Sequence, residues 1–455
     1  MLNSNMIFER AGRDARIVPK QRCVWMHKRL KGKSTQMYKT MLGLLLLAMS
    51  GWGLAQAADP VAAGGHDLAS AHVHGASPKM DKMWQEMLTK PALASSLAFD
   101  GRGRLWRVSV RDGHVFVSRS DDMGKIFSQP IQVNPEAEAI AADGENRPKI
   151  VVADKGIVYV SYTQALGKPF SGNIRFSRSL DGGLHFSTPI TVNDNREIIS
   201  HRFEAMAVNQ RGQVFLAWLD KRDASAAGRQ GRPYEGAAVY YAVSDDGGAG
   251  FGPNRKVIDH SCECCRVAMA LDTDGVPVVF WRQVFGKNTR DHALVRLDGK
   301  STPVRVSYDN WRVDACPHHG PAISIAGDGI YHLVWFDNAP DRHGLFYAHS
   351  LAGGKRFSTP VSFGRYDNQA SHPDVLSRGK DVFIVWKEFD GDHSEVFLMH
   401  SRDGGASWGK SYSIATTGGN SDYPRLVADA SRVFMSWNTL KEGLRLIDIE
   451  PEAKR

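Results

Sequence analysis

Two short segments of the 455-residue chain concentrate residues that bind soft metal ions. The first reads Cys262-Glu263-Cys264-Cys265-Arg266, and the second reads Cys316-Pro317-His318-His319-Gly320. Thiolate and imidazole together suit copper or zinc, and thiolates favour Cu(I). We therefore predict a copper or zinc site. Its candidate ligands are Cys262, Cys264, Cys265, Cys316, His318, His319 and His372.

Disulfides are the alternative use of these cysteines, because an exported protein forms them readily. Adjacent Cys264 and Cys265 pair with each other only under strain. Cys23 would be lost with the presequence described below, and of the four remaining cysteines only Cys316 lies outside the first segment, so at most one bridge can join the two segments. This uneven distribution favours a ligand role, and the choice between disulfides and thiolates stays open here.

A repeated turn shows which kind of fold must position these residues. It reads Ser120-x-Asp122-x-Gly124-x-x-Phe127 and recurs at 179–186, 244–251 and 401–408, with a decayed copy at 350–357. An Asp-Gly turn of this kind accepts backbone N–H bonds through its carboxylate, which predicts a structural role. Repetition every 50 to 65 residues, with one gap of double length, indicates a radially repeated all-β protein.

Strands that end in an aromatic residue give the register of the repeat. Short alternating strands run to Tyr162, Trp218, Trp281, Trp335, Trp386 and Trp437, and a weaker one ends at Ser109. They predict a seven-bladed β-propeller of four-stranded antiparallel blades, with six blades as the alternative. No stretch has a convincing helical period. The last unit is one strand short, and we expect residues before the first blade to supply the missing outer strand.

The loops that enter the innermost strands should meet at the channel of such a propeller. They lie 14 to 16 residues before the register positions. The residues found there are Leu93, Arg147, Arg202, Cys265, His319, His372 and Tyr423. We therefore expect the Cys/His site to form at the channel mouth.

The turn resembles the Asp-box, or bacterial neuraminidase repeat, and residues 90–451 resemble the sialidase-like propeller superfamily. This resemblance implies an exo-acting glycosidase as the alternative function. The family binds a substrate carboxylate with three arginines and uses a tyrosine nucleophile helped by a glutamate. The residues here that match these roles are Tyr423, Glu204, Arg147, Arg202, Arg266 and Arg425.

Three departures weaken this alternative. The family's Phe/Tyr-Arg-Ile-Pro motif is missing from the first unit, and its nearest match is Asn146-Arg147-Pro148 in the second. The family's acid/base aspartate has only loosely placed counterparts in Asp314 and Asp374. Sialidases are also six-bladed.

The ends of the chain predict export. Residues 42–54 form an apolar run of signal-peptide length, followed by Ala55-Gln56-Ala57 as a cleavage site. We divide the chain into a presequence and signal peptide (1–57), a flexible tail rich in His and Met (58–88) and a propeller (89–455). Residues 1–36 could precede the true start, at Met37 or Met41. The expected location is periplasmic or secreted.

Cleavage would also remove the net charge. Residues 1–57 hold ten of the 57 basic and two of the 49 acidic residues, so 47 of each remain. A neutral body gives no electrostatic footprint for nucleic acid or an anionic membrane. The predicted function is a binding protein with a Cys/His metal site on the propeller axis. The alternatives are a glycosidase for sialic acid or another anionic sugar, and a scaffold for a protein partner.

Overall fold

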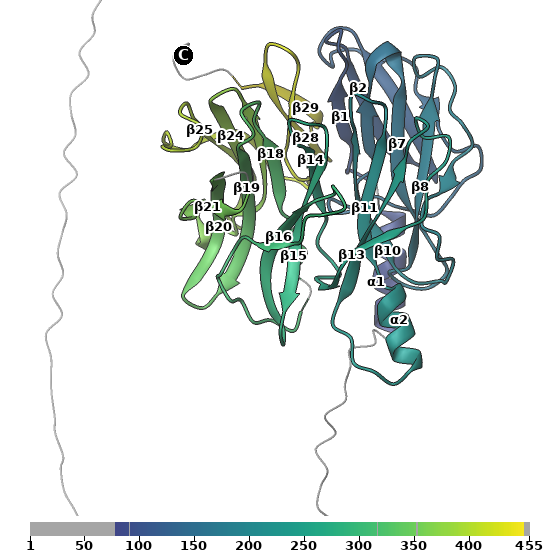
Figure 1. Ribbon diagram of the computed structural model, residues 1–455. Coiled ribbons are helices and arrows are strands. Elements are labelled where there is room, and N and C mark those ends of the chain that lie inside the picture. Colours follow the sequence, from purple (N-terminus) through teal and green to yellow (C-terminus); the bar gives the residue numbers. More distant parts are fainter. Residues whose placement is uncertain (1–77, 91, 316, 352–353, 450–455) are drawn as a thin grey trace, which may run out of the picture. The chain divides into compact units, whose positions relative to one another are not determined.

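The computed structural model describes residues 78–90, 92–315, 317–351 and 354–449, all within the unit Asp67–Arg455 (Figure 1). Strands make up most of the regular secondary structure of the described residues. Their two α-helices are α1 (Pro78–Thr89) and α2 (Arg222–Arg229), and two 3-10 turns span Asp154–Gly156 and Tyr366–Asn368. Neither α-helix is long and apolar enough to cross a membrane.

The strands form antiparallel sheets of three to eight strands. The first sheet is β1 (Ser96–Phe99), β2 (Leu105–Arg111), β3 (His114–Ser120) and β4 (Ile131–Gln132). The second is β5 (Ile140–Ala141), β6 (Lys149–Val152), β7 (Val158–Ala165), β8 (Gly172–Ser179) and β9 (Ile190–Thr191).

The next sheet has eight strands and consists of two four-stranded groups. One group is β10 (His201–Val208), β11 (Val214–Asp220), β12 (Ala237–Ser244) and β13 (Arg255–Ser261). The other is β14 (Ala268–Leu271), β15 (Pro277–Phe285), β16 (Thr289–Arg296) and β17 (Val304–Arg305). A single pair, Ser261 with Gln283, joins β13 to β15, so each group is a separate sheet in all but this contact.

Three sheets complete the fold. One is β18 (Ala322–Ile325), β19 (Tyr331–Ala339), β20 (Arg342–Leu351), β21 (Arg356–Phe357) and β22 (Val361–Phe363). The next is β23 (Ser371–Arg378), β24 (Asp381–Phe389), β25 (Ser394–Ser401) and β26 (Tyr412–Thr417). The last sheet is β27 (Arg425–Ala428), β28 (Val433–Thr439) and β29 (Gly443–Asp448).

The innermost strands of these sheets contact one another in a closed cycle. β1 touches β6, and the cycle continues through β10, β14, β18 and β23 to β27, which returns to β1. The predicted all-β propeller architecture is therefore confirmed, and the loops that lead into these strands surround one axis.

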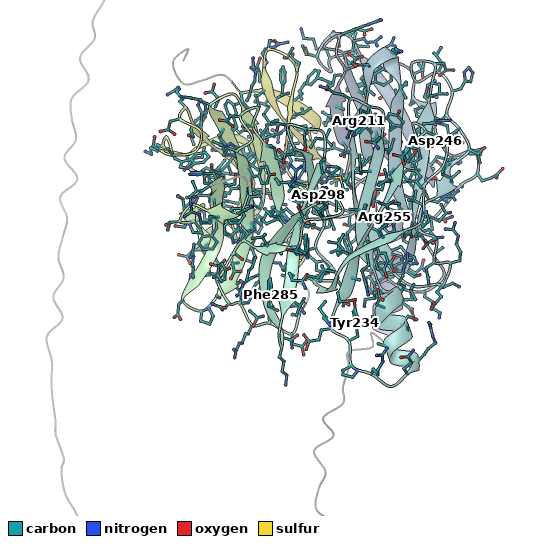
Figure 2. All side chains as sticks on the ribbon, in the orientation of Figure 1. Arg211, Tyr234, Asp246, Arg255, Phe285 and Asp298 are labelled. Atoms are coloured by element: carbon teal, nitrogen blue, oxygen red, sulfur yellow. The ribbon has the colours of Figure 1, made fainter. Side chains whose placement is uncertain are left out.

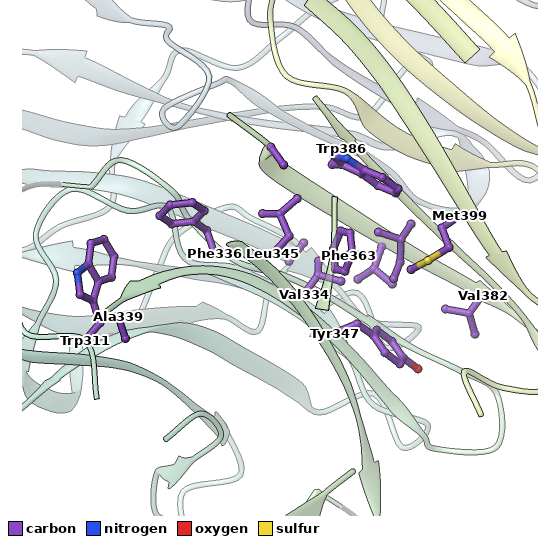
Figure 3. Packing of buried hydrophobic residues seen from close by; sticks show 14 residues of the cluster. Trp311, Val334, Phe336, Ala339, Leu345, Tyr347, Phe363, Val382, Trp386 and Met399 are labelled. Carbon is purple, nitrogen blue, oxygen red and sulfur yellow. The ribbon is translucent and has the colours of Figure 1, made fainter. Parts of the chain in front are cut away.

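The predicted strand-ending aromatics form the packing between sheets. Trp218, Trp281, Trp335, Trp386 and Trp437 are all at most 1 % exposed. Around Trp386, apolar side chains of neighbouring sheets interlock, as Figure 3 shows with Val334, Phe336 and Phe363. A polar residue two positions later often accepts the indole N–H, as Asp220 does from Trp218 at 2.8 Å and Glu388 from Trp386 at 2.9 Å. The burial of each tryptophan thus requires a specific acceptor.

The repeated turn has the structural role expected from its residues. In the copy at 244–251, Asp246 Oδ1 accepts a hydrogen bond from Ser244 Oγ at 2.7 Å and from the N–H of Ala249 at 2.9 Å. Ser244 Oγ in turn accepts the N–H of Gly248 at 2.8 Å. Asp246 lies at the opposite end of the sheets from Tyr234 and Phe285 (Figure 2). The turns close hairpins away from the channel mouth described below.

Two expectations about the ends need correction. Residues 78–88, predicted to belong to a flexible tail, lie in helix α1, because Trp84 is buried beside Phe170 with 5.2 Å between ring centroids. The last sheet has three strands as expected, but the described residues just before the first sheet, 78–90 and 92–95, form a helix and coil and supply no fourth strand. The remainder of the predicted tail and the presequence lie outside the described residues.

Candidate functional site

Glu145 joins four segments of the chain at the channel mouth. Its Oε2 accepts the backbone N–H groups of Arg266 at 2.8 Å and Gly320 at 3.0 Å, and its Oε1 accepts Arg266 Nη1 at 2.8 Å. His372 Nδ1 lies 3.5 Å from the same Oε1. Burial opposes ionisation, but the Arg266 charge and these hydrogen bonds hold the pKa of Glu145 well below its usual range. The predicted convergence of entrance loops is therefore present.

Four aromatic rings stack beside this carboxylate. Tyr423 lies parallel to His372 with 3.4 Å between ring centroids, His372 lies 4.6 Å from His319, and His319 lies 4.2 Å from Phe336. His372 adopts a left-handed backbone conformation (φ 51°) at a bulge in β23 between Ser371 and Asp374. Burial lowers the pKa of His372 to about 4 and lowers that of His319 as well, so both imidazoles are neutral at pH 7.

The predicted carboxylate-binding arginines already have partners within the protein. Arg147 bonds Asp422 at 2.8 Å, Arg266 bonds Glu145, and Arg425 pairs with Asp374 at 3.1 Å. Arg202 lies 3.8 Å from Asp143, and the ring of Trp84 covers its guanidinium at 5.0 Å. A substrate carboxylate would therefore have to compete with bonds that are already formed.

Glu204, the predicted helper of Tyr423, has different partners. It accepts hydrogen bonds from Thr163 at 2.9 Å and Ser161 at 3.5 Å and pairs with Lys149 at 3.9 Å. Burial raises the pKa of Glu204 and lowers that of Lys149 to about 8. The carboxylates whose charges influence Tyr423 are those of Glu145, Asp143 and Asp422, and burial is the main reason that its pKa is raised.

The three cysteines of the first segment form a compact triangle in the loop between β13 and β14. Cys262 Sγ lies 3.7 Å from both Cys264 Sγ and Cys265 Sγ, which are 4.0 Å apart. All three side chains are at most 4 % exposed. The point equidistant from these sulfurs is about 2.2 Å from each, close to a metal–thiolate bond length.

A guanidinium lies against this triangle. Arg290 Nη1 donates to Cys262 Sγ at 3.0 Å. Hydrogen bonds from the two neighbouring thiols and the charges of Arg290 and Arg282 hold the pKa of Cys262 well below its usual value, whereas burial raises that of Cys265. Within the part of the chain that the structure describes, Cys262, Cys264 and Cys265 form a group able to hold a metal ion.

The other predicted ligands are placed differently. Cys316 lies outside the described residues. His318 is exposed and lines a cleft at the channel mouth, while His319 and His372 belong to the ring stack. Neither stacked imidazole is among the side chains that group with the three sulfurs.

A second group able to hold a metal consists of Asp291, Asp309 and Asp337, whose carboxylates gather within 4.8 Å of one another. Asp291 pairs with Arg305, and Asp309 pairs with Arg342 at 3.1 Å. Asp337 is fully buried, and burial raises its pKa to about 8.

The sequence analysis did not identify Glu145 or Asp337, although the position of each within its repeat unit indicates it. Glu145 stands two residues before Arg147, one of the predicted entrance positions. Asp337 stands two residues after Trp335, where other units place the indole acceptor. Here Trp335 donates instead to Asp309 at 3.1 Å, which leaves Asp337 without that bond.

A cleft of about 1370 Å³ opens beside the channel mouth. Tyr423, His318 and Asp143 line its inner end, and α1 contributes Glu86 and Leu88. Gly144 is required there, because a Cβ at this position would lie 2.2 Å from the Tyr423 ring. The Tyr423 ring is thus held between Gly144 and His372.

No family model matches the chain, and no curated protein matches it. Solved structures do. An ulvan lyase of polysaccharide lyase family PL25 superposes with a TM-score of 0.52 at 10% identity, covering 80% of this chain and 92% of that one. The polysaccharide lyase Uly1 gives 0.51 at 11% identity, covering 80% and 91%.

A Hadza microbial sialidase gives a TM-score of 0.47 at 15% identity, covering 79% of this chain and 75% of that one. Likeness at such low identity concerns the fold and not the activity. The chain has the fold of the sialidase-like and related β-propellers.

Proposed function

We propose that this protein is an exported, seven-bladed propeller that binds a thiophilic metal ion, copper or zinc, through Cys262, Cys264 and Cys265. The observation that carries the proposal is the spacing of the three sulfurs, 3.7 to 4.0 Å. A single ion with bonds of about 2.3 Å can contact all three at this spacing. The closed cycle of inner strands supports seven blades.

The surroundings of the triangle support a metal over disulfides. A disulfide needs sulfurs about 2 Å apart, much closer than any of these pairs. Arg290 offsets part of the charge that thiolate ligands bring into a buried site. The proposal does not use His319 and His372 as metal ligands, because these two imidazoles lie beside each other and do not group with the sulfurs.

Metal analysis of the exported protein, purified from the extracytoplasmic fraction, tests the proposal. We expect one copper or zinc ion per chain and its loss in Cys262→Ser and Cys265→Ser. His372→Asn is the matched control and should retain the ion. Four blocked thiols and no metal would reject the proposal and leave a disulfide-linked propeller. A Cys316→Ser variant shows whether the fourth cysteine contributes a bond.

A second candidate function is action on a carbohydrate at Tyr423. The favouring observation is that the Tyr423 ring is fixed between Gly144 and His372 at the inner end of a large cleft. The matched PL25 and Uly1 structures are polysaccharide lyases, which agrees with this class of substrate. Under this candidate, the carboxylates whose charges influence the tyrosine are those of Glu145, Asp143 and Asp422, and not that of Glu204.

Turnover assays test this candidate separately from the metal. The probes are a fluorogenic sialoside and a uronate-containing polysaccharide. Turnover that Tyr423→Phe abolishes and Glu204→Gln leaves largely intact would support it. Absence of turnover on both probes would reject it, whatever the metal content.

A further inference from the structure

The cysteine triangle offers three sulfur atoms that are arranged almost symmetrically. Cys262 Sγ lies 3.7 Å from the sulfurs of Cys264 and Cys265, which are 4.0 Å apart. In the part of the chain that the structure describes, no imidazole or carboxylate gathers with these sulfurs. An ion at the centre of the triangle would lie in the plane of the sulfurs, with three similar bonds. Cu(I) is stable with three soft ligands of this kind.

A zinc ion would need one more ligand than the triangle supplies. Zn²⁺ in proteins is almost always four-coordinate, and its structural sites are closed by four side chains. The nearby candidates from the described chain are already engaged. His319 lies beside His372 in the ring stack, and Glu263, the carboxylate within the cysteine loop, pairs with Lys221. The number of ligands therefore favours Cu(I) over zinc.

The charges around the triangle favour the same ion, and Arg290 contributes most directly. Its Nη1 donates to Cys262 Sγ at 3.0 Å, its Nε donates to the carbonyl oxygen of Val313 at 3.0 Å, and its backbone N–H donates to that of Trp311 at 2.7 Å. The side chain is buried. A positive charge is thus fixed against one of the sulfur ligands, in a place where water screens it little.

Two other guanidinium groups act on the triangle from farther away. The charge of Arg282 acts on the sulfurs of Cys262 and Cys265. That of Arg202 acts on the remaining sulfur, although Asp143 at 3.8 Å offsets part of it. Arg282 likewise faces the aspartate group of the neighbouring sheet. Arg290 is therefore the cation whose effect on the sulfurs should be largest.

A positive neighbour discriminates between two ions that the same three thiolates bind. The complex of three thiolates with Cu(I) carries two negative charges, and the complex with Zn²⁺ carries one. Each guanidinium stabilises the more negative complex more strongly, because the Coulomb energy is proportional to the charge. Arg290 should therefore raise the preference for the monovalent ion, whatever it does to the affinity for both.

We infer that the cysteine triangle binds Cu(I) with three sulfur ligands, and that Arg290 is the residue that favours this ion over zinc. The inference rests on the proposed function and deepens it, since it names the ion, its oxidation state and a specificity-determining residue outside the ligand set. Cys316 has no part in the three-coordinate site.

Competition titrations of the exported protein test the inference. The protein is reduced and freed of metal without oxygen, then titrated with Cu(I) against bicinchoninate and with Zn²⁺ against a chromophoric zinc chelator. We expect one Cu(I) per chain, and X-ray absorption at the copper edge should show three sulfur neighbours and no fourth ligand. Cys316→Ser should leave the affinity for Cu(I) unchanged.

Variants of Arg290 test its role in the choice of ion. Arg290→Met should lower the ratio of Cu(I) affinity to Zn²⁺ affinity by about ten-fold or more. A purely structural defect would weaken both ions alike and leave this ratio unchanged. Arg290→Lys keeps the charge and should restore most of the ratio. Arg402→Met removes a charge from the exposed turn after β25 and is the matched control.

The possible failures are distinguishable. Absence of binding for both ions would reject the proposed function itself. Zinc bound at least as tightly as Cu(I), or four ligands at the copper, would leave a metal site standing and overturn the inference. An unchanged ratio in Arg290→Met would overturn the role of the guanidinium. If that variant does not fold, the ligand count and the two affinities of the wild-type protein still decide between the ions.

Discussion

Two groups of possible metal ligands differ in how their charges are balanced. Cys262, Cys264 and Cys265 form one, and Asp291, Asp309 and Asp337 form the other. The charge of Arg282 acts on both, since it lowers the pKa of Cys262 and opposes the rise in that of Asp337.

The cysteine group and the aspartate group differ in the other side chains that contact them. Asp291 has Arg305, Asp309 has Arg342 and the Trp335 indole, and Asp337 accepts the N–H of Ala339 at 3.0 Å. A cation at the aspartates would compete with the guanidinium groups of Arg305 and Arg342. At the sulfurs, Arg290 donates to Cys262, but sulfur is an intrinsically weak acceptor of hydrogen bonds. Proximity alone therefore does not distinguish a metal site from a network of ion pairs.

Removal of Arg282 should have the largest effect, because both groups depend on it. Its Nη2 donates to the carbonyl oxygens of His319 at 3.1 Å and Phe336 at 2.7 Å, and its side chain is 1 % exposed. We expect Arg282→Met to lower the free energy of unfolding by about 3–5 kcal/mol, because two carbonyl oxygens each lose a hydrogen bond from a charged donor. Urea denaturation measures this, and a loss below about 1 kcal/mol would contradict the shared role.

Cys262→Ala and Asp309→Asn should separate the two groups by metal content. The cysteine variant should lose the bound ion, and the aspartate variant should retain it. Mass spectrometry under native conditions reads both. Loss of the ion from Asp309→Asn alone would reverse the assignment.

Asp337→Asn should make stability less sensitive to pH between about 4 and 8. The folded protein holds the Asp337 proton up to a pKa of about 8, while the unfolded chain releases it near its usual 3.8. The folded state binds more protons in this window, so stability falls as pH rises, by about 1.4 kcal/mol per pH unit. Thermal unfolding from pH 5 to 8 should show a shallower decline in the variant. If the wild-type protein and the variant lose stability equally with pH, the Asp337 carboxyl group is not the source of the decline.

Two buried imidazoles, that of His372 at the channel mouth and that of His332 in β19, should give the opposite dependence. Burial lowers the pKa of His372 and His332 to about 4. The unfolded chain binds more protons between pH 4 and 6.5, so stability falls as pH drops through this range, on the order of 3 kcal/mol per group. His372→Gln should flatten the acid side of the profile and leave the alkaline side unchanged. An unaltered acid slope would contradict the assignment.

The architecture was predictable because every repeat unit carries its own pattern of alternating strands. Alternating strands that end in Trp218 or Trp386 fix the sheets whatever surrounds them. The cysteine triangle was also predictable, since Cys262, Cys264 and Cys265 are close in sequence. The partners of the arginines could not be predicted in this way. Arg147 and Asp422, for example, are 275 residues apart, and only the closed ring brings them together.

Helix α1 escaped prediction for a related reason. The sequence of Pro78–Thr89 has few apolar residues, and its order comes from Trp84 packing with Ala141, Ala165 and Phe170. Such a helix gains its stability from tertiary contacts and not from its own propensity.

The position of Trp84 has a consequence for how the chain reaches its final state. This indole precedes the first strand, yet the groups that bury it come from the second sheet and, through Arg202, from the third. It can find its place only after both of those sheets exist. Burial of Trp84 is therefore a late step in assembly of the ring. It reports that step from helix α1, the part of the described chain that is synthesised first.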